Sequence, residues 1–209
     1  MWAANIKICS EKPTVNKIIE AAVPLFATKG LAAVSVKELA DAAGVNIALI
    51  SYYFGGKDNL YAFILEKQLT FLSDAIDIIS KEEISPVMKI RRFADTLLAA
   101  YRQSPHIDRL FFMEILNPTK YFDSIVKTAA ASLHLFLQNC IKEAVARGDF
   151  RPDIEPQMAA MSFMKILNVS FTTQHFCKEL LPDSKDIAAE YMAHALEIYL
   201  HGVMKEAEN

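Results

Sequence analysis

The sequence predicts an all-α protein in which a small N-terminal domain of three helices precedes a larger helical domain, with about nine helices in total. Only six glycines and eight prolines interrupt its 209 residues, so long stretches contain no helix-breaking residue. Apolar residues recur three and four positions apart within these stretches. No run shows the sustained alternation and β-branched content that are typical of a strand. Helices are therefore the only regular elements that we predict.

The first predicted helix spans 14–28 and is amphipathic. Gly30 follows it and can adopt the left-handed conformation that ends a helix. The apolar face comprises Ile18, Ile19, Ala22, Leu25 and Phe26. Because such a face must be covered, we expect this helix to share a small core with the next two.

Two short helices follow around a single glycine, Gly44. Ser35 is a good N-cap for the first of them, and Glu38, three positions later, completes a capping box. Asn46 is the N-cap candidate of the second helix. The side chains expected to hold the second helix across the first are Ala40, Val45, Ile50 and Phe54. Such a pair is typical of a helix-turn-helix, which places its second helix in a DNA groove, although ordinary helical hairpins are more common.

The remaining helices are longer, and the first of them continues directly from the N-terminal domain. The nine predicted helices span, in chain order, 14–28, 36–43, 47–54, 58–76, 86–103, 106–116, 121–147, 156–178 and 184–206. Ser85 and Pro86 form an N-cap followed by proline at the first helical position. Gly148 ends the long helix predicted at 121–147. We expect the helix that begins at Asp58 to connect the two domains without a flexible linker.

Three motifs between residues 14 and 65 point to a known family. They are a Phe-x-x-x-Gly stretch, an Ala-Gly-Val turn and a closing Tyr-x-Phe-x-x-Lys segment. The residues that carry them are Phe26, Gly30, Ser35, Leu39, Ala40, Ala43, Gly44, Val45, Tyr52, Tyr53, Phe54, Lys57 and Leu60. Together they resemble the N-terminal signature of the TetR family of bacterial transcriptional regulators. The step from Gly148 to Pro152 between two long helices is also similar to the family's.

This resemblance implies a domain organisation and a function. We expect an N-terminal arm at 1–13, a helix-turn-helix DNA-binding domain at 14–58, and an effector-binding and dimerisation domain at 59–209. The resemblance implies a homodimer that forms through the last two helices, about 156–178 and 184–206, and a repressor that leaves a palindromic operator when an effector binds. Residues 156–178 are unusually apolar for a surface helix, so they need a cover from the core or from a second subunit.

The expected DNA contacts lie on the helix pair and just after it. They are Ser35, Lys37, Ile47, Ala48, Leu49, Ser51, Tyr52, Tyr53 and Lys57. Lys57, at the start of a helix, is expected to share a phosphate with backbone amides. Many family members have threonine and tyrosine where this chain has Leu49 and Ser51. An apolar residue can contact a thymine methyl but cannot pair with guanine or adenine, so Lys37 is the better polar candidate for base readout.

The charge of the chain argues against strong DNA binding. The formal net charge is −3, and residues 1–62 hold six basic and five acidic side chains. A module with so little net charge makes few phosphate contacts. A dimer doubles those contacts, and helix N-termini add amide donors that the formal charge omits.

The expected effector site consists of polar residues within apolar helices, together with nearby aromatic residues. The candidates are Phe112, Glu114, His134, Gln138, Asn168 and His175. Buried polar residues more often satisfy neighbouring groups than bind ligands, so a structural role is the alternative for each. The aromatic and methionine content of residues 97–175 suits a small hydrophobic or aromatic molecule.

Two alternatives belong to other functional classes. A helical metalloenzyme of the ferritin-like kind needs Glu-x-x-His pairs, whereas Glu190 and His194 are four residues apart and His175 with Cys177 are two ligands without partners. We therefore expect no enzyme activity, cofactor or metal. A helical coregulator that does not bind DNA is the other alternative. The absence of a signal peptide or membrane span in the sequence and the three scattered cysteines favour a cytoplasmic location.

Overall fold

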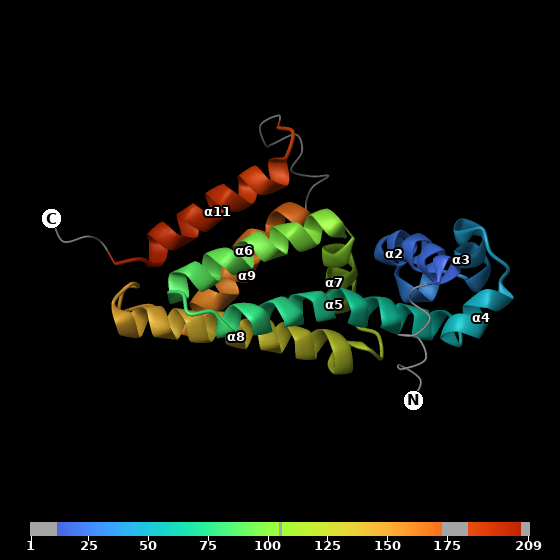
Figure 1. The fold of residues 1–209 in the computed structure, drawn as a ribbon, viewed down its shortest axis with the longest axis horizontal. Helices are drawn as coiled ribbons and strands as arrows, with labels where there is room; N and C mark the ends of the chain where they lie inside the picture. Colours follow the sequence, from blue (N-terminus) through green and yellow to red (C-terminus); the bar gives the residue numbers. More distant parts are fainter. Residues whose placement is uncertain (1–11, 105, 173–183, 206–209) are drawn as a thin grey trace. The chain divides into compact units, whose positions relative to one another are not determined.

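The computed structural model describes residues 12–104, 106–172 and 184–205, and within them it confirms the all-α fold (Figure 1). These residues form nine α-helices and one short π-helix. The elements are α2 (Pro13–Ala33), α3 (Val36–Ala43), α4 (Ala48–Phe54), α5 (Lys57–Lys81), α6 (Pro86–Gln103), α7 (Ile107–Leu116), η1 (Phe122–Val126), α8 (Lys127–Arg147), α9 (Pro156–Thr172) and α11 (Ile187–Val203). No helix in this part of the chain combines the length and hydropathy that a membrane crossing needs.

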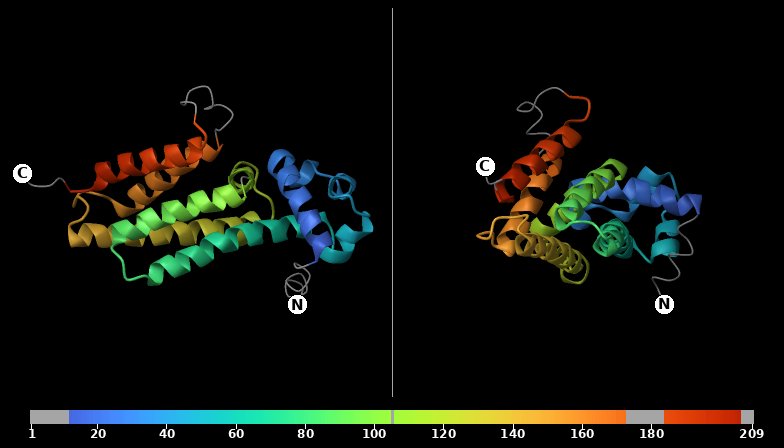
Figure 2. Two further views of the ribbon diagram at one scale, coloured as in Figure 1. Left: turned by 45° about the horizontal axis from the view of Figure 1, so that its top comes forward. Right: turned by 60° about the vertical axis from the view of Figure 1, so that its left-hand side comes forward.

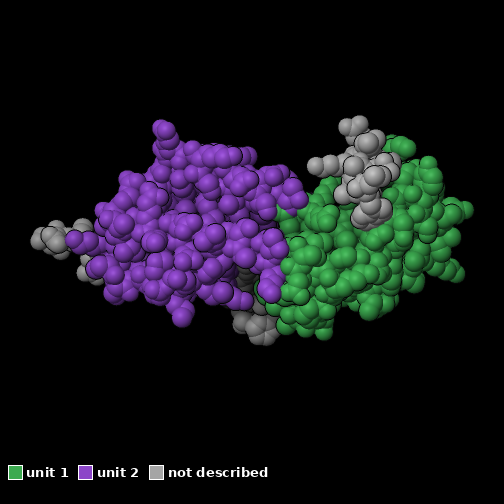
Figure 3. Space-filling model, turned by 90° about the horizontal axis from the view of Figure 1, so that it is seen from below, with its two compact units in different colours: residues 1–69, 109–126 green, residues 70–108, 127–209 purple. Residues whose placement is uncertain are grey.

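The chain divides into two compact units (Figure 3). Unit 1 comprises residues 1–69 and 109–126, and unit 2 comprises residues 70–108 and 127–209. One boundary therefore falls inside helix α5 and another inside helix α7. The segment 109–126 belongs to the same unit as the first helices, although about forty residues separate it from them in the sequence.

Unit 1 contains α2, α3, α4 and the beginning of α5 around a small core. The buried stripe of α2 includes Ile18, Ala22 and Phe26, and these three side chains are fully buried. The ring of Phe26 meets the ring of Tyr61 on α5 edge to face, at a centroid distance of 5.0 Å. Gly30 has φ 74° and ψ 167°, which interrupts the helical geometry of α2 where the sequence predicted its end.

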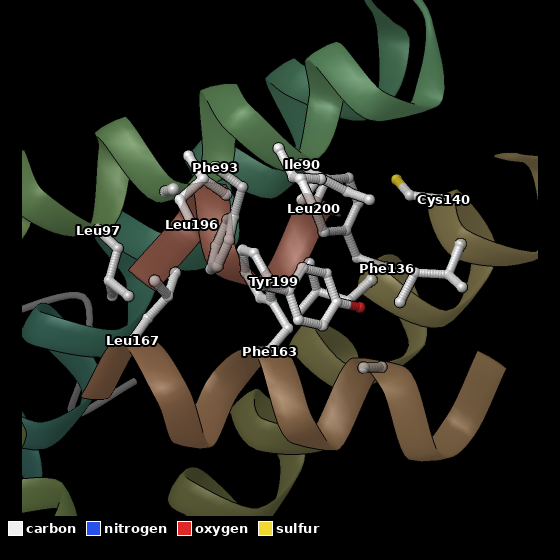
Figure 4. Packing of buried hydrophobic residues seen from close by; sticks show 14 of the residues in the cluster. Ile90, Phe93, Leu97, Phe136, Cys140, Phe163, Leu167, Leu196, Tyr199 and Leu200 are labelled. Carbon is white, nitrogen blue, oxygen red and sulfur yellow. The ribbon is translucent and has the colours of Figure 1, made fainter. Parts of the chain in front are cut away.

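Unit 2 is built on four helices, α6, α8, α9 and α11 (Figure 2). Helix α6 packs against α8, α8 against α9, α9 against α11, and α11 against α6, so the four close a ring. Each helix directs apolar side chains into the centre (Figure 4). Residues that meet there include Ile90, Phe93, Leu97, Phe136, Cys140, Phe163, Leu167, Leu196, Tyr199 and Leu200. The cluster is apolar apart from the tyrosine hydroxyls at its edge.

The step after Gly148 ties the end of α8 to the end of α11. Gly148 has φ 80°, a conformation that glycine adopts without strain. Phe150 and Met204 then form an isolated antiparallel bridge, flanked by the hydrogen bonds Arg151 N–H to Val203 O and Lys205 N–H to Asp149 O. The sequence predicted the helix end at this point but not the pairing with the last helix.

Several predicted helix limits need correction. The helix predicted at 121–147 begins as the π-helical turn η1. The sequence did not predict this turn, because apolar periodicity does not distinguish a π turn from an α turn. The last helix begins at Ile187 and not at 184, since Asp186 is the N-cap and accepts a hydrogen bond from the Ala189 amide. The predicted end of the helix at 156–178 lies outside the described residues.

Candidate nucleic-acid interface

Helix α3 and the turn after it have the local geometry that their residues predict. The Ser35 hydroxyl accepts a hydrogen bond from the Glu38 amide at 3.1 Å and so caps the helix. Gly44 closes the helix with φ 61°, and the Val45 amide then donates to the Ala40 carbonyl at 3.0 Å. A side chain at the Gly44 position would find open space, so the positive φ alone favours glycine there.

Helix α4 begins on the side chain of Asn46, as predicted. Its Oδ1 accepts from the Ala48 amide at 2.9 Å, and its carbonyl accepts from the Leu49 amide at 2.9 Å. Ile47 already has helical backbone angles, although the helix proper starts at Ala48. Gly55, with φ 73°, ends the helix after two turns. The turn and the caps leave α4 short and held at both ends.

The two sides of α4 differ sharply in burial. Ile50 and Phe54 are fully buried, as the sequence predicted. The exposed residues are Ile47, Ala48, Ser51 and Tyr52. Ile47 is 49% exposed and Tyr52 is 75% exposed, which is unusual for large apolar and aromatic side chains. An exposed stripe of this kind on a short, firmly backed helix is suited to contact another molecule.

The other expected DNA contacts are either less exposed residues of α4 or residues at the beginning of α3. Leu49 and Tyr53 are half-buried. Tyr53 packs edge to face against Tyr52, with 4.9 Å between ring centroids. Ser35 and Lys37 are exposed at the beginning of α3. The candidates on the two helices therefore combine one exposed stripe with a half-buried edge.

Lys57, the expected phosphate contact at the start of α5, bonds to carbonyl groups of its own unit. Its Nζ donates to the Leu31 carbonyl at 2.9 Å, to the Ala32 carbonyl at 3.4 Å and to the Val34 carbonyl at 2.6 Å. Leu31 and Ala32 lie in the last turn of α2, and Val34 lies between α2 and α3. An ammonium group has three N–H donors, so all of them have acceptors within the protein.

Lys12 is a basic residue at this edge that the sequence reasoning did not select. It precedes Pro13, the first residue of α2, and its side chain is exposed. Its Nζ lies over the Tyr53 ring, 5.7 Å from the centroid. No local pattern marks Lys12, because its neighbour Tyr53 is distant in the sequence. The contact places a second cation beside α4.

Charge pairs elsewhere in unit 1 reduce the number of free cations. Lys29 and Glu38 form an ion pair at 2.5 Å between α2 and α3. The hydrogen bond from Lys29 lowers the pKa of Glu38, and a hydrogen bond from the backbone of Ser35, the partner of Glu38 in the predicted capping box, lowers it as well. Lys120 pairs with Asp58 at 2.9 Å, and that hydrogen bond raises the pKa of Lys120.

Glu114, an effector candidate, is fully buried inside unit 1 and is already bonded. Its Oε1 accepts from the Tyr61 hydroxyl at 2.6 Å. Its Oε2 accepts from the Thr119 amide at 3.2 Å and from the Thr119 hydroxyl at 3.1 Å. Burial, with the adjacent Glu114 carboxylate, raises the pKa of Tyr61. These contacts fit the structural alternative for Glu114, and its contact with an effector stays a prediction.

The other effector candidates are divided between the units. Phe112 lies in unit 1 and is half-buried. His134 and Gln138 are half-buried on α8 in unit 2, four residues apart and so on one face of the helix. The Asn168 side chain and all of His175 lie outside what the structure describes. The structure therefore brings only His134 and Gln138 together.

Asp108 is a half-buried residue that the sequence did not point to. It lies in the first turn of α7, in the part of that helix that belongs to unit 2. Its Oδ2 is buried and has no hydrogen-bond partner among the described residues. Burial raises the pKa of Asp108 to about 7. Within residues 12–104, 106–172 and 184–205, no three potential metal ligands of the His, Cys, Asp or Glu type lie together.

Two family descriptions match this chain over most of its length. Residues 18–63 match the bacterial regulatory proteins of the tetR family. Residues 86–198, more than half of the chain, match the tetracyclin repressor-like C-terminal domain. The first match covers the helices of the candidate interface.

Curated relatives are similar over shorter segments. The probable HTH-type transcriptional regulator YttP of Bacillus subtilis is 50% identical over 54 residues, which is 26% of this chain and 26% of YttP. The HTH-type transcriptional repressor SCO4008 of Streptomyces coelicolor is 33% identical over 101 residues, 48% of this chain and 49% of that protein. The chain thus spans between a quarter and a half of the length of these two relatives.

Solved structures share the fold over nearly the whole chain. The ketosteroid transcriptional regulator KstR2 of Mycobacterium tuberculosis superimposes with a TM-score of 0.77 at 18% identity, covering 92% of this chain and 95% of that one. A putative fatty acid metabolism regulator of Clostridium perfringens superimposes with a TM-score of 0.73 at 18% identity, covering 91% and 100%. At these identities the similarity concerns the fold alone.

Proposed function

The chain belongs to the TetR family of bacterial regulatory proteins, and from this premise we propose that it is a transcriptional repressor that binds a palindromic operator as a homodimer. The observation that carries the proposal is the exposed stripe of α4. Ile50 and Phe54 anchor that helix from behind, and Ile47 and Tyr52 project from its other side. A helix that is held in this way can enter a major groove without losing its own packing.

We assign the contacts with DNA bases and the contacts with the DNA backbone to different residues of helices α3 and α4. Ile47, Ala48 and Leu49 are apolar and suit contact with thymine methyl groups. Lys37, exposed at the start of α3, is the polar candidate for a base edge. Ser51, Tyr52 and Tyr53 present hydroxyls that suit phosphate oxygens, and Ser35 supports them as the cap of α3. We therefore expect the base contacts of α4 to fall mainly on A·T pairs of the operator.

Selection of bound sequences from random duplex DNA tests this function. We expect an enriched palindrome whose half-site centres lie about one helical turn, or a small multiple of it, apart. Lys37→Ala and Leu49→Ala should change the enriched sequence, whereas Glu83→Gln, an exposed change in unit 2, should not. If the wild-type protein enriches no sequence and binds no duplex, the coregulator alternative replaces the repressor.

The homodimer that we propose forms through α9 and α11. On α9, Met158 is 71% exposed and Met161 is 50% exposed, and on α11 Ile198 is 70% exposed. The two helices pack against each other, and exposed apolar residues on a packed pair are typical of a subunit interface. The predicted interface at 156–178 and 184–206 includes these residues.

Sedimentation of charged variants tests the interface. Met158→Glu and Ile198→Glu should convert a dimer to a monomer, because a buried carboxylate without a partner is strongly disfavoured. Ile78→Glu is the matched control, since Ile78 is 62% exposed on α5 and lies on neither helix. Equal dissociation by all three changes would contradict the assignment.

We also propose that a small hydrophobic or aromatic effector releases the protein from DNA. The partly buried pair His134 and Gln138 on α8 supports a polar end to an otherwise apolar site in unit 2. A panel of such compounds should contain some that raise the melting temperature and weaken operator binding. His134→Ala with Gln138→Ala should remove both effects, and a panel without any stabilising compound would contradict the proposal.

The functional division of the chain remains a proposal as well. We assign DNA binding to 14–58, with an arm at 1–13, and effector binding and dimerisation to 59–209. A regulator of bacterial DNA acts beside the chromosome, so we propose a cytoplasmic location. Because the family consists of regulators, the metalloenzyme alternative is no longer supported.

A further inference from the structure

The two lysines at the edge of α4 have different surroundings, and this difference assigns them different tasks. Lys57 is half-buried and its Nζ lies 2.6, 2.9 and 3.4 Å from three carbonyl oxygens. Lys12 is exposed, and its Nζ lies over an aromatic ring. Because a ring face attracts a cation without occupying its N–H donors with lone pairs, the ammonium group of Lys12 keeps donors for another acceptor.

The acceptors of Lys57 explain why this lysine is needed inside the protein. Leu31, Ala32 and Val34 follow Gly30, where α2 loses its helical geometry and leaves carbonyls without helical partners. Val34 directly precedes Ser35, the N-cap of α3. An ammonium group that holds these carbonyls therefore holds the beginning of α3 to the beginning of α5. A phosphate contact would withdraw a donor from these carbonyls, among them that of the buried residue Val34.

The position of Lys12 adds to the edge of α4 that Tyr52 and Tyr53 form. Tyr53 carries Lys12 on its ring and Tyr52 against its side. Among the described residues, no carboxylate pairs with Lys12. The ammonium group is thus held over an aromatic ring without being neutralised, so its charge and its N–H donors suit a phosphate oxygen.

We propose that Lys12 contacts the DNA phosphate beside α4 and that Lys57 is a positioning residue that makes no phosphate contact. This assignment rests on the proposed DNA-binding function and refines its contact residues. It moves the phosphate-binding cation from the start of α5 to the residue that precedes α2.

The salt dependence of DNA affinity separates the two lysines. The probe is the duplex selected for the wild-type protein, titrated at several NaCl concentrations. The logarithm of the affinity falls with the logarithm of the salt concentration by about 0.9 for each phosphate neutralised. Lys12→Gln should lower this slope by about one per protomer and leave the melting temperature unchanged. Lys12→Arg should keep the slope, and Lys67→Gln, an exposed lysine on α5, is the matched control.

Lys57 variants should show the opposite pattern. Lys57→Met should lower the melting temperature by several degrees and leave the salt slope unchanged at temperatures where the protein is folded. If that variant does not fold, Lys57→Arg answers the same question, since a guanidinium keeps the charge but does not converge on three carbonyls in the same way. We expect Lys57→Arg to lower the melting temperature and keep the slope.

Each outcome decides between this assignment and its alternatives. A reduced slope for Lys57→Met with an unchanged melting temperature would overturn it, as would an unchanged slope for Lys12→Gln. If the wild-type protein binds no duplex at any salt concentration, the DNA-binding function itself fails, and the phosphate role of Lys12 fails with it. The melting temperatures of the Lys57 variants still report its positioning role in that case.

Discussion

Units 1 and 2 are both helical, yet they bury their polar groups very differently. In unit 1, the fully buried Glu114 accepts from Tyr61, and the half-buried Lys57 donates to the carbonyls of Leu31 at the end of α2 and of Val34. In unit 2, four helices close around a cluster of apolar side chains, and the half-buried Asp108 is not part of that cluster. The hydroxyl of Tyr199 at its edge reaches only a neutral carbonyl, that of Ala159, at 3.0 Å.

The directional hydrogen bonds of unit 1 fix its geometry, whereas the apolar burial of unit 2 contributes mainly to its free energy of unfolding. Apolar burial is not directional, so it stabilises unit 2 without selecting one exact arrangement. A buried hydrogen bond to a charged group is lost when the geometry changes, and its loss leaves an unsatisfied group. Unit 1 carries the helix pair that must present α4 accurately, and it uses such contacts.

The largest effect should come from the apolar core of unit 2. Phe163→Ala removes a fully buried ring that meets Phe93 and Tyr199. We expect the free energy of unfolding to fall by about 3–5 kcal/mol, because a cavity replaces the ring. Urea denaturation measures it, with Asp95→Asn, an exposed change on α6, as the control. A loss no larger than that of the control would show that the ring contributes little to the core.

The buried tyrosine of unit 1 should have the next largest effect. Tyr61→Phe leaves the Glu114 carboxylate without its donor at 2.6 Å. We expect a loss of about 1.5–3 kcal/mol, the range for hydrogen bonds to charged groups. A double-mutant cycle with Glu114→Gln should show that the two changes are not additive. Additive losses would mean that the pair is not coupled.

Asp108 should make the stability of the protein depend on pH. Its folded pKa, about 7, lies above the ordinary value, so the folded state holds a proton that the unfolded state releases. Stability from this group is therefore present at acid pH, below the unfolded pKa, and declines as pH rises towards 7. Asp108→Asn should remove that decline, a difference of about 1–2 kcal/mol between pH 5 and 8 after allowance for partial exposure.

Thermal unfolding of both proteins across this pH range measures the effect. Glu83→Gln, an exposed carboxylate change in the same unit, is the control and should leave the pH profile unchanged. Parallel profiles for wild type and Asp108→Asn would contradict the prediction.

The smallest effect should come from the tyrosine of unit 2. Tyr199→Phe removes a hydrogen bond to the neutral carbonyl of Ala159, and we expect a loss of about 0.5–1.5 kcal/mol. Burial raises the pKa of both Tyr61 and Tyr199, so the two changes form a matched pair that differs in the acceptor. Equal losses from both would remove the distinction between the units.

Local patterns in the sequence predicted much of the fold and part of the candidate site. The Ser35 cap, the left-handed Gly44 and the buried faces of α2 and α4 depend on residues within one or two helical turns. The sequence could not predict the role of Lys57, because its acceptor Leu31 lies 26 residues away. It also could not predict that Glu114 bonds to Tyr61, 53 residues distant.

The sequence by itself determined the helices, the tight turn, the family and the apolar face of each helix, because periodicity, caps and glycine conformation act over a few residues. Only the tertiary structure decided which polar groups remain free. A lysine or a glutamate that faces solvent cannot be told in the sequence from one that bonds a buried partner. Their state depends on the donors and acceptors that folding brings from distant segments. Folding supplies such partners to Lys57 and Glu114, whereas the ammonium group of Lys12 lies over a ring and keeps its N–H donors.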